Sequence, residues 1–214
     1  MDCDLLLPPF RYDAELQDYL QLPDFPNQLW DGKIAFLDRD GVINLGSEFY
    51  INSPDEVILL PNAGLCIGQL RRHGYRICVV TNQSPIGRGL WTHKNLHLIH
   101  SKISELLLQE DKDALLDLIL YSPYSPEENS WARKPNPGML EAGRQILGNS
   151  KGKKINILYG EKWINRRDES DSIMVGDRDT DQLAAENYGV KFFRCNPDIG
   201  LYDVIDSILG ENNG

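Results

Sequence analysis

The stretch IAFLDRDGVIN, residues 34–44, decides the fold. Its first four residues, 34–37, form a short apolar run of the kind that predicts a buried strand. Two carboxylates, Asp38 and Asp40, follow this run directly. Like charges so close together repel each other unless a cation lies between them or one carboxyl holds a proton. A hard divalent ion such as Mg²⁺ prefers oxygen ligands of this kind. The stretch therefore predicts a buried strand that ends in a magnesium site.

Strands and helices alternate along the rest of the chain. Apolar runs predict strands at 75–80, 116–121, 172–175 and 190–194, and a further apolar run lies at 57–60. Helices are predicted at 62–73, from 92 onward, at 137–148, after the strand at 172–175 as far as 188, and at 201–209. Residues typical of helix ends are Gly74, Thr92, Asn136, Pro137 and Gly189. Because such alternation is typical of a parallel sheet covered on both faces, we expect a doubly wound α/β fold with no large cap domain.

Two segments of the chain are less regular than the rest. Residues 1–31 are rich in Pro, Asp and Leu and show no period, which indicates an N-terminal arm that packs on the domain. Residues 32–214 carry the alternating pattern and are expected to form one domain. Within it, residues 149–171 are irregular and highly charged, so we interpret them as an insertion with a hairpin around 155–159.

The composition narrows the classes of function. A chain of 214 residues with 41% hydrophobic and 25% charged residues suits one globular domain. The formal net charge of −10 repels nucleic-acid phosphates. The four cysteines form no C-x-x-C pair, which favours reduced thiols over disulfides or structural zinc.

The sequence also gives no sign of a membrane location. No apolar run reaches the roughly 20 residues that span a bilayer, and the first residues lack the positive charge of a signal peptide. We therefore expect a cytoplasmic protein, either a monomer or a small homo-oligomer, with no membrane partner and no nucleic-acid partner.

Polar motifs follow three further strands of the predicted sheet. They are TNQS at 81–84, Arg133 with Lys134 before the helix expected at 137, and GDRDTD at 176–181. In an open α/β sheet, ligands bind beyond the carboxyl ends of the strands, so these motifs should meet Asp38 and Asp40. Hydroxyls, amides and cations beside a helix N-terminus suit phosphoryl oxygens. Each motif alone is common in ordinary turns, but the four together, in this order, are far more specific.

These four motifs resemble those of the haloacid dehalogenase superfamily. The resemblance covers about 33–208. The longer strings FLDRDGVIN, VTNQSPIGRG and RKPNPGM are similar to those of the branch that contains heptose 1,7-bisphosphate 7-phosphatases and histidinol-phosphate phosphatases. The resemblance implies a Rossmann-like fold and a two-step, Mg²⁺-dependent phosphoryl transfer.

The resemblance also implies a role for each matching residue. Asp38 would attack phosphorus, and Asp40 would protonate the leaving oxygen and then activate water. Asp38, the main-chain carbonyl of Asp40 and Asp177 would hold Mg²⁺. Thr81 and Lys134 would stabilise the transferring phosphoryl group. Substrate-binding residues would be Asn82, Gln83, Ser84, Arg133 and Arg178.

One loop departs from the branch that the chain resembles. Members of that branch carry a zinc loop of the pattern C-x-H … C-x-C before the R-K-P motif. The corresponding positions here are Ser122, Tyr124, Ser130 and Ala132. Because zinc needs thiolate or imidazole donors, we expect no zinc and a loop held by packing instead.

Two features of the sequence allow more than one interpretation. Asp181 lies one helical turn beyond Asp177 and is either a residue that orients a metal-bound water or a plain surface acid. His93, His97 and His100 share one face of a predicted helix, where a polar face is favoured over a metal site.

The function predicted best is hydrolysis of a small sugar phosphate, with D-glycero-D-manno-heptose 1,7-bisphosphate as the first candidate. Histidinol phosphate and a polynucleotide 3′-phosphate are alternative substrates. A non-catalytic scaffold is the alternative from another class. It is disfavoured because an idle site has no physical reason to keep mutually repelling acids.

Overall fold

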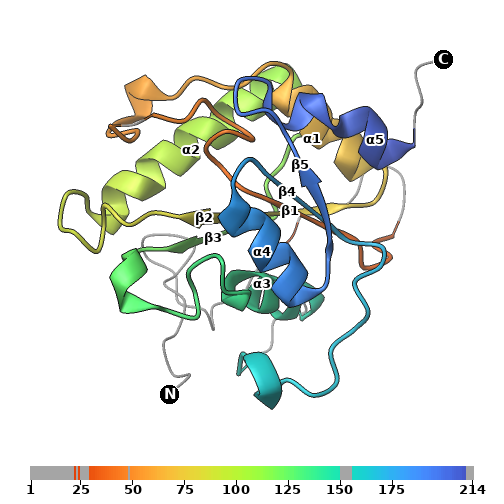
Figure 1. Cartoon of the computed structure of the whole chain (residues 1–214). Helices are drawn as coiled ribbons and strands as arrows, with labels where there is room; N and C mark the ends of the chain where they lie inside the picture. The colour runs from red at the N-terminus through yellow and green to blue at the C-terminus, as the bar shows by residue number, and fades with distance from the viewer. Residues whose placement is uncertain (1–21, 23, 25–28, 48, 150–155, 211–214) are drawn as a thin grey trace.

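The computed structural model describes residues 22, 24, 29–47, 49–149 and 156–210. Within these ranges five parallel strands form one sheet in the order β3-β2-β1-β4-β5 (Figure 1). The strands are β1 (Ile34–Leu37), β2 (Arg76–Asn82), β3 (Leu118–Ser122), β4 (Ile173–Gly176) and β5 (Lys191–Arg194). The α-helices are α1 (Ala63–Arg72), α2 (His93–Glu110), α3 (Gly138–Gly148), α4 (Asp179–Tyr188) and α5 (Ile205–Leu209). The doubly wound α/β fold expected from the sequence is confirmed.

The strand order places β1 and β4 side by side at the middle of the sheet. Leu37, the last residue of β1, is level with Val79 of β2 and Val175 of β4. From β1 the chain adds β2 and β3 on one side of the sheet. It then crosses back to add β4 and β5 on the other side of β1. Such a switch point is where ligands bind in open α/β sheets. The residues that follow β1 and β4 therefore face one crevice.

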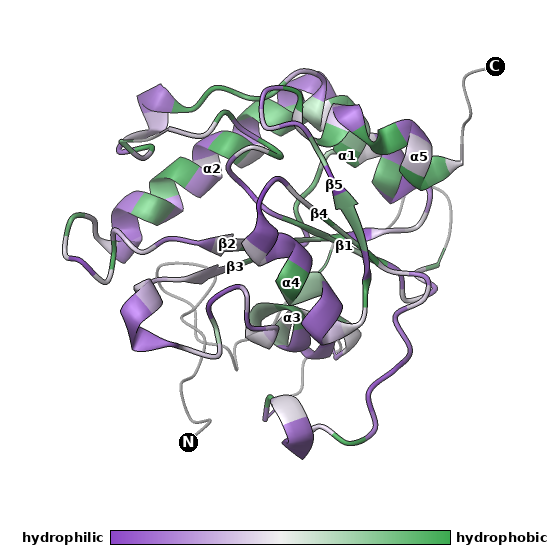
Figure 2. Cartoon of the chain, viewed as in Figure 1, coloured by the Kyte–Doolittle hydropathy of each residue, from purple (hydrophilic) through white to green (hydrophobic). Residues whose placement is uncertain are grey.

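Helices cover the sheet on both faces, which explains the uninterrupted apolar runs of the central strands. Ala35 and Leu37 pack into the core with α1, α2 and α5, whereas Ile34 and Phe36 pack into the core with α3 and α4. All four side chains are fully buried. Figure 2 shows hydrophilic and hydrophobic residues alternating along the helices, as expected of helices that cover a core with one face.

The helix ends largely follow the predicted signals. The Thr92 hydroxyl accepts a hydrogen bond from the Asn95 amide at the start of α2, and Gly189 ends α4 with a φ of 85°. The predicted cap of α3 was wrong by one position, since Pro137 is its N-cap residue. Asn136 instead donates its side-chain amide to the Ser130 carbonyl.

Two predicted elements differ in the structure. The run 57–60 adds no strand to the sheet, because its main chain pairs with the segment that follows β1: Leu45 donates to the Ile58 carbonyl and Leu60 to the Ile43 carbonyl. It thereby supports the loop that carries the aspartates. The helix expected at 201–209 is divided into a 3-10 turn, Gly200–Asp203, and α5.

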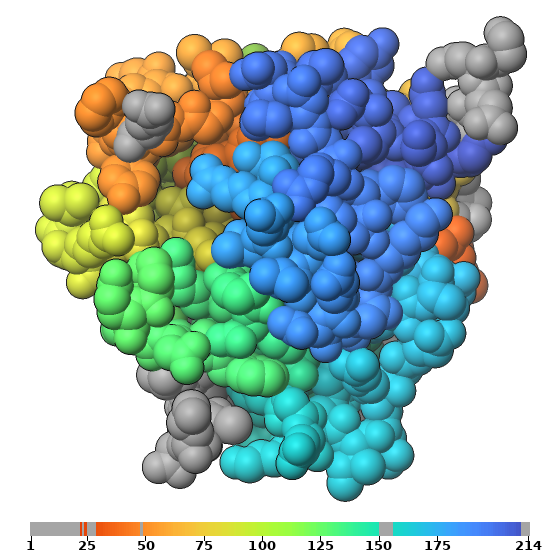
Figure 3. Space-filling model, viewed as in Figure 1, coloured from red at the N-terminus to blue at the C-terminus, as the bar shows by residue number. Residues whose placement is uncertain are grey.

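The segment predicted as an insertion is described from residue 156 onward. It contains a 3-10 turn, Gly160–Lys162, and no strand in its described part, so the hairpin is absent there; Ile155 lies outside the described residues. Gln145 of α3 holds it by exchanging two hydrogen bonds with the main chain of Leu158. Figure 3 shows this segment, in cyan, lying against the rest of the molecule.

Most of the predicted N-terminal arm lies outside the described residues. Of its described part, Leu22 and Trp30 pack against the core that contains α3 and α4. The Asp24 carbonyl accepts a hydrogen bond from Arg71.

Candidate active site

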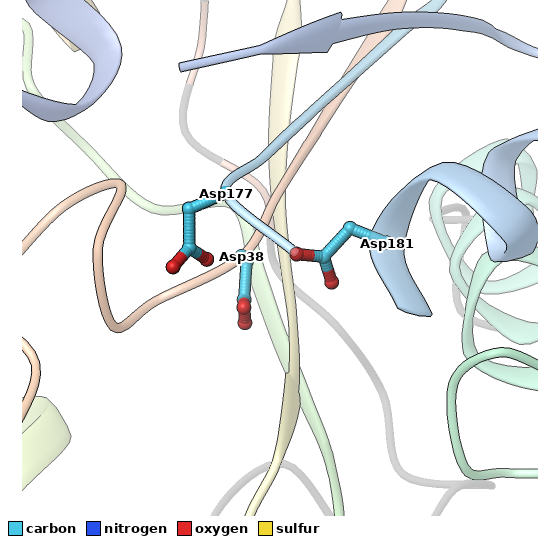
Figure 4. A group of neighbouring side chains, drawn as sticks. All are labelled: Asp38, Asp177 and Asp181. Carbon is cyan, nitrogen blue, oxygen red and sulfur yellow. The ribbon is translucent and has the colours of Figure 1, made fainter. Parts of the chain in front are cut away.

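Three carboxylates converge at the switch point of the sheet. Asp38 follows β1, Asp177 follows β4, and Asp181 comes from the first turn of α4 (Figure 4). One oxygen of each lies within 4.8 Å of the others. Burial raises the pKa of Asp177, and the charge of Asp181 acts in the same direction. One oxygen of Asp177, Oδ1, is buried and has no hydrogen-bond partner among the described residues.

Two glycines make this convergence possible. Gly41 has a φ of 79°, and a Cβ on it would lie 2.8 Å from the Asp177 carboxylate. A Cβ on Gly176 would lie 2.3 Å from Cβ of Asp181. Because any larger residue at either position would collide with a carboxylate-bearing side chain, the two glycines set the spacing of the cluster.

Lys134 is buried between two of the carboxylates. Its Nζ lies 2.9 Å from Asp38 Oδ1 and 2.6 Å from Asp181 Oδ1. Burial, together with the charges of Asp181 and Asp40, raises the pKa of Asp38 to about 7 despite the nearby ammonium. Burial disfavours the charged lysine as well, yet Asp181 and Asp38 outweigh it and raise the pKa of Lys134. A lysine held charged in this way suits the stabilisation of a phosphoryl group.

Asp40 is held by its neighbour in the chain. The buried Arg39 guanidinium donates to both Asp40 oxygens, from NH2 at 2.9 and 2.8 Å. Asn44 and Gln83 donate further hydrogen bonds to the same carboxylate. Burial would raise the pKa of Asp40, but the Arg39 charge outweighs it and holds that pKa below its ordinary value. Asp40 is therefore ionised in the free protein.

The TNQS segment, residues 81–84, lies beside these groups, and its residues contact different parts of the site. Thr81 is buried, and its hydroxyl accepts a hydrogen bond from Gln83, the residue that also reaches Asp40. Asn82 exchanges two hydrogen bonds with the main chain of Lys134 and so fixes the lysine loop to β2. Ser84 is buried at the start of the following loop.

Two predicted substrate residues lie at the rim of the site. Arg133 lines a cavity of about 170 Å³ together with Lys134. Partial burial and the neighbouring charge of Arg88 lower the pKa of Arg133, although Glu127 and Glu128 act in the opposite direction. The Arg178 side chain is 65% exposed and lies 3.7 Å from Asp177, so it faces the solvent edge of the cluster. Figure 3 shows a hollow on this face between the yellow, green and light-blue segments.

Comparisons with known proteins identify the family. The family described as polynucleotide kinase 3 phosphatase matches residues 33–198. The chain belongs to this family. A D-glycero-β-D-manno-heptose-1,7-bisphosphate 7-phosphatase of Pseudomonas aeruginosa is 41% identical over 113 residues, which cover 53% of this chain and 61% of that protein. The chain thus spans about three fifths of the length of this curated relative.

Two solved structures are similar over most of this chain. One is a D,D-heptose 1,7-bisphosphate phosphatase from B. bronchiseptica in complex with magnesium and phosphate, with a TM-score of 0.67, 27% identity and coverage of 84% of this chain and 99% of the other. The second, from Mesorhizobium loti, is described as a HAD-like phosphatase, with a TM-score of 0.62, 27% identity and coverage of 92% and 95%. The predicted resemblance to the haloacid dehalogenase phosphatases is confirmed. No helix in the described ranges is both long and apolar enough to cross a bilayer.

Two residues of this site were not assigned a definite role from the sequence. Asp181 is fully buried, which excludes the interpretation as a surface acid. Arg39 lies between the two predicted catalytic aspartates, and His100 packs against it with Nε2 3.4 Å from the Arg39 NH1. Burial and the Arg39 charge lower the pKa of His100 well below its ordinary value. This part of the predicted polar histidine face is therefore buried, and its histidine is neutral.

At the end of β3 and in the loop that follows it, four positions correspond to the zinc ligands of the branch that the chain resembles, and none of them carries a side chain that suits zinc. Ser122, Ser130 and Ala132 are buried, and Tyr124 is partly buried. Thiolate or imidazole donors are absent from these four positions, so the residues do not fit a zinc site. The loop is instead crossed by hydrogen bonds, such as the one that Arg133 NH1 donates to the Tyr124 carbonyl at 2.8 Å.

Proposed function

We propose that the chain is a magnesium-dependent phosphomonoesterase that hydrolyses the 7-phosphate of D-glycero-D-manno-heptose 1,7-bisphosphate through an aspartyl-phosphate on Asp38. The observation that carries this proposal is the contact of Lys134 with Asp38 beside the carboxylate cluster at the switch point. It supports the proposal because a carboxylate that can attack phosphorus, a cation that can bind phosphate and oxygens that can hold a metal lie together in one buried site.

The residues present fit a divalent cation. Asp38 and Asp177 would hold it with the main-chain carbonyl of Asp40, and Oδ1 of Asp177 is a buried acceptor that needs a positive partner. The carboxylates of Asp38, Asp40, Asp177 and Asp181 outnumber the buried cations Arg39 and Lys134 by two charges. When bound, Mg²⁺ would supply charge neutralisation between the nucleophile and the phosphoryl oxygens.

The side chains can perform both steps of the reaction. In the first step an Asp38 oxygen forms a bond to phosphorus while the ester P–O bond breaks, and the leaving oxygen takes a proton from Asp40. In the second step Asp40 takes a proton from water, whose oxygen attacks phosphorus and releases Asp38. The ionised state imposed by Arg39 suits this second role, and the first requires that Asp40 take up a proton in the substrate complex.

The phosphoryl oxygens would meet Lys134 and the Thr81 hydroxyl. Lys134 is fixed before substrate arrives, because Asn82 holds its main chain and Asp181 holds its ammonium. Groups that are already oriented stabilise a transition state without a cost for reorganisation. Gln83 completes this arrangement by joining Thr81 to Asp40.

The rim of the site favours a substrate with a second negative charge. Partial burial and the charge of Arg88 lower the pKa of Arg133, although Glu127 and Glu128 act in the opposite direction, so a substrate anion near the two arginines would be attracted to both. Heptose 1,7-bisphosphate offers such an anion in its 1-phosphate. Histidinol phosphate offers an ammonium group instead and is disfavoured for that reason.

Other properties support a small substrate in the cytoplasm. The net charge of −10 opposes the phosphates of a polynucleotide, in spite of the family description. Cys66, Cys78 and Cys195 are buried free thiols, and burial raises the pKa of each, which suits a reducing compartment.

Arg88→Gln tests the second phosphate site. We expect KM for heptose 1,7-bisphosphate to rise about tenfold, because an exposed charge-assisted contact is lost, with little change in KM for the heptose 7-monophosphate. Steady-state kinetics with both substrates measure the difference, and Lys94→Gln on α2 is the charge-matched control. An equal effect on both substrates would remove the 1-phosphate from this position.

Metal binding should depend on pH below neutrality. Because the pKa of Asp38 is about 7 and only the ionised carboxylate binds Mg²⁺, protons compete with the metal below that pH. We expect the apparent Mg²⁺ affinity to fall about tenfold per pH unit between pH 7 and 5. Calorimetric titration with Mg²⁺ in the absence of substrate measures this affinity. An Mg²⁺ affinity that stays unchanged from pH 8 to pH 5 would contradict the prediction.

Phosphate release from a panel of substrates tests the function itself. The panel holds both anomers of heptose 1,7-bisphosphate, histidinol phosphate, hexose phosphates and a 3′-phosphorylated oligonucleotide, each with Mg²⁺. We expect one heptose bisphosphate to be hydrolysed far faster than the others. Preference for the oligonucleotide or histidinol phosphate would replace the proposed substrate, and no release at all would favour a scaffold role.

A further inference from the structure

The loop that delivers Lys134 is bound to α3 by a tryptophan side chain. Trp131 lies three residues before Lys134, and its Nε1 donates a 2.7 Å hydrogen bond to Oε2 of Glu141. Its carbonyl also accepts a hydrogen bond from the Gly138 amide at 3.1 Å. A Cβ on Gly138 would lie 2.3 Å from that carbonyl oxygen, so the close approach depends on glycine.

Glu141 binds a second segment with its other oxygen. Oε1 accepts a 2.9 Å hydrogen bond from the Gly160 amide, which belongs to the 3-10 turn Gly160–Lys162. Glu141 is only 3% exposed. A buried carboxylate is costly unless donors satisfy both of its oxygens, and here one donor comes from each segment. This single side chain therefore joins α3, the Lys134 loop and the segment after residue 156.

The tryptophan ring is only partly enclosed by its neighbours. Trp131 lines a surface cavity of about 530 Å³, whose other walls include Trp163 and Arg166. The ring also packs against the core that contains α3 and α4, and the hydrogen bond to Glu141 adds a directional contact to this packing. The loop downstream of Trp131 carries both Arg133 and Lys134, the residues placed at the rim and the centre of the active site.

We propose that Glu141 and Trp131 are positioning residues for Lys134 and Arg133, with the turn at Gly160 as their outer support. This inference rests on the proposed phosphatase function. It gives the 156–171 segment a role in catalysis although none of its residues reaches the carboxylate cluster. Loss of the contact lets the loop shift, and small displacements of a phosphate-binding group are expensive in rate.

The chain offers a matched set of variants. Trp131→Phe keeps an aromatic ring and removes only the donor, and Glu141→Ala releases both segments. Gln145→Ala is the control, because Gln145 lies one turn further along α3 and holds the same segment through Leu158 without touching Trp131. Glu141→Gln keeps one acceptor for Trp131 and should restore part of what Glu141→Ala loses.

We expect kcat to fall about tenfold in Trp131→Phe and Glu141→Ala, with Mg²⁺ affinity unchanged and Gln145→Ala close to the wild type. Amide hydrogen exchange of residues 123–137 provides a readout that needs no turnover, and it should become faster in the first two variants only. If the wild type is active and both Trp131→Phe and Glu141→Ala match it, the positioning role is wrong. If the wild type is inactive on every substrate, the proposed function fails, while the exchange data still test the contact.

Discussion

Asp38→Asn is expected to lower turnover by about ten-thousandfold or more, the scale seen when a covalent nucleophile is removed. The amide of asparagine has nearly the shape of the carboxylate, but it is uncharged and too weak a nucleophile to attack phosphorus. Lys134 keeps its second partner, Asp181, so the residues around position 38 should remain in place. The defect should therefore lie in kcat rather than in folding.

The measurement combines turnover with detection of the covalent intermediate. Rapid quenching of the wild type with substrate should yield a protein heavier by one phosphoryl group at Asp38, and the variant should yield none. Asp198→Asn, at an exposed site, controls for the loss of one negative charge. Substantial turnover in Asp38→Asn, or a phosphoryl group on another residue, would overturn the covalent role of Asp38.

The same substitution should change the pH dependence of stability. The pKa of Asp38 rises from an ordinary 3.8 to about 7 in the folded protein, so between these values the folded state binds a proton that the unfolded state has lost. The protonated Asp38 therefore adds to the free energy of unfolding of the wild type at low pH. This contribution is lost as the pH rises through the folded-state pKa of about 7. Asp38→Asn has no such loss, so it should become more stable relative to the wild type with rising pH.

The sheet and the convergence of the principal candidate site residues could be predicted because their causes are local in the sequence. A strand buried on both faces needs an apolar run, and parallel strands bring their carboxyl ends together, so residues such as Asp38 and Asp177 had to meet. The run 57–60 has the same local composition as a strand. It pairs with the segment after β1 instead, and no period in the sequence distinguishes the two outcomes.

The partners of the predicted residues were harder to foresee. Arg39 folds back on the carboxylate of its own neighbour, and the direction of one long side chain is not encoded by spacing. Trp131 and Glu141 meet because a loop and a helix return to each other, which only the tertiary structure reveals. Asp181 had a usable signal, since Gly176 lies five residues before it and leaves room for a side chain to turn inward.

Asp181→Asn is the second substitution with a large expected effect. Asp181 places an oxygen 2.6 Å from the Lys134 ammonium, and its other oxygen accepts a hydrogen bond from the Arg178 amide at 3.1 Å. Removing one charge of a buried pair costs roughly 3–5 kcal/mol when the other charge stays uncompensated; since Asp38 remains beside Lys134, we expect about half of that loss in stability. We also expect kcat to fall about a hundredfold to a thousandfold, because Lys134 is then drawn toward Asp38, the proposed nucleophile, rather than held for the phosphoryl group.

Asp179→Asn is the matched control for this variant. Asp179 lies in the same turn of α4, but its side chain is 91% exposed and pairs with Arg194 at the surface, so its loss should change neither kcat nor the melting temperature by much. The Mg²⁺ requirement separates the two roles that a buried acid could have here. If Asp181 positions Lys134, its substitution should lower kcat with a smaller change in Mg²⁺ affinity than Asp177→Asn produces. If both variants weaken Mg²⁺ binding equally, Asp181 acts through the metal, and Lys134 is positioned by its other contacts, those with Asp38 and Asn82 among them.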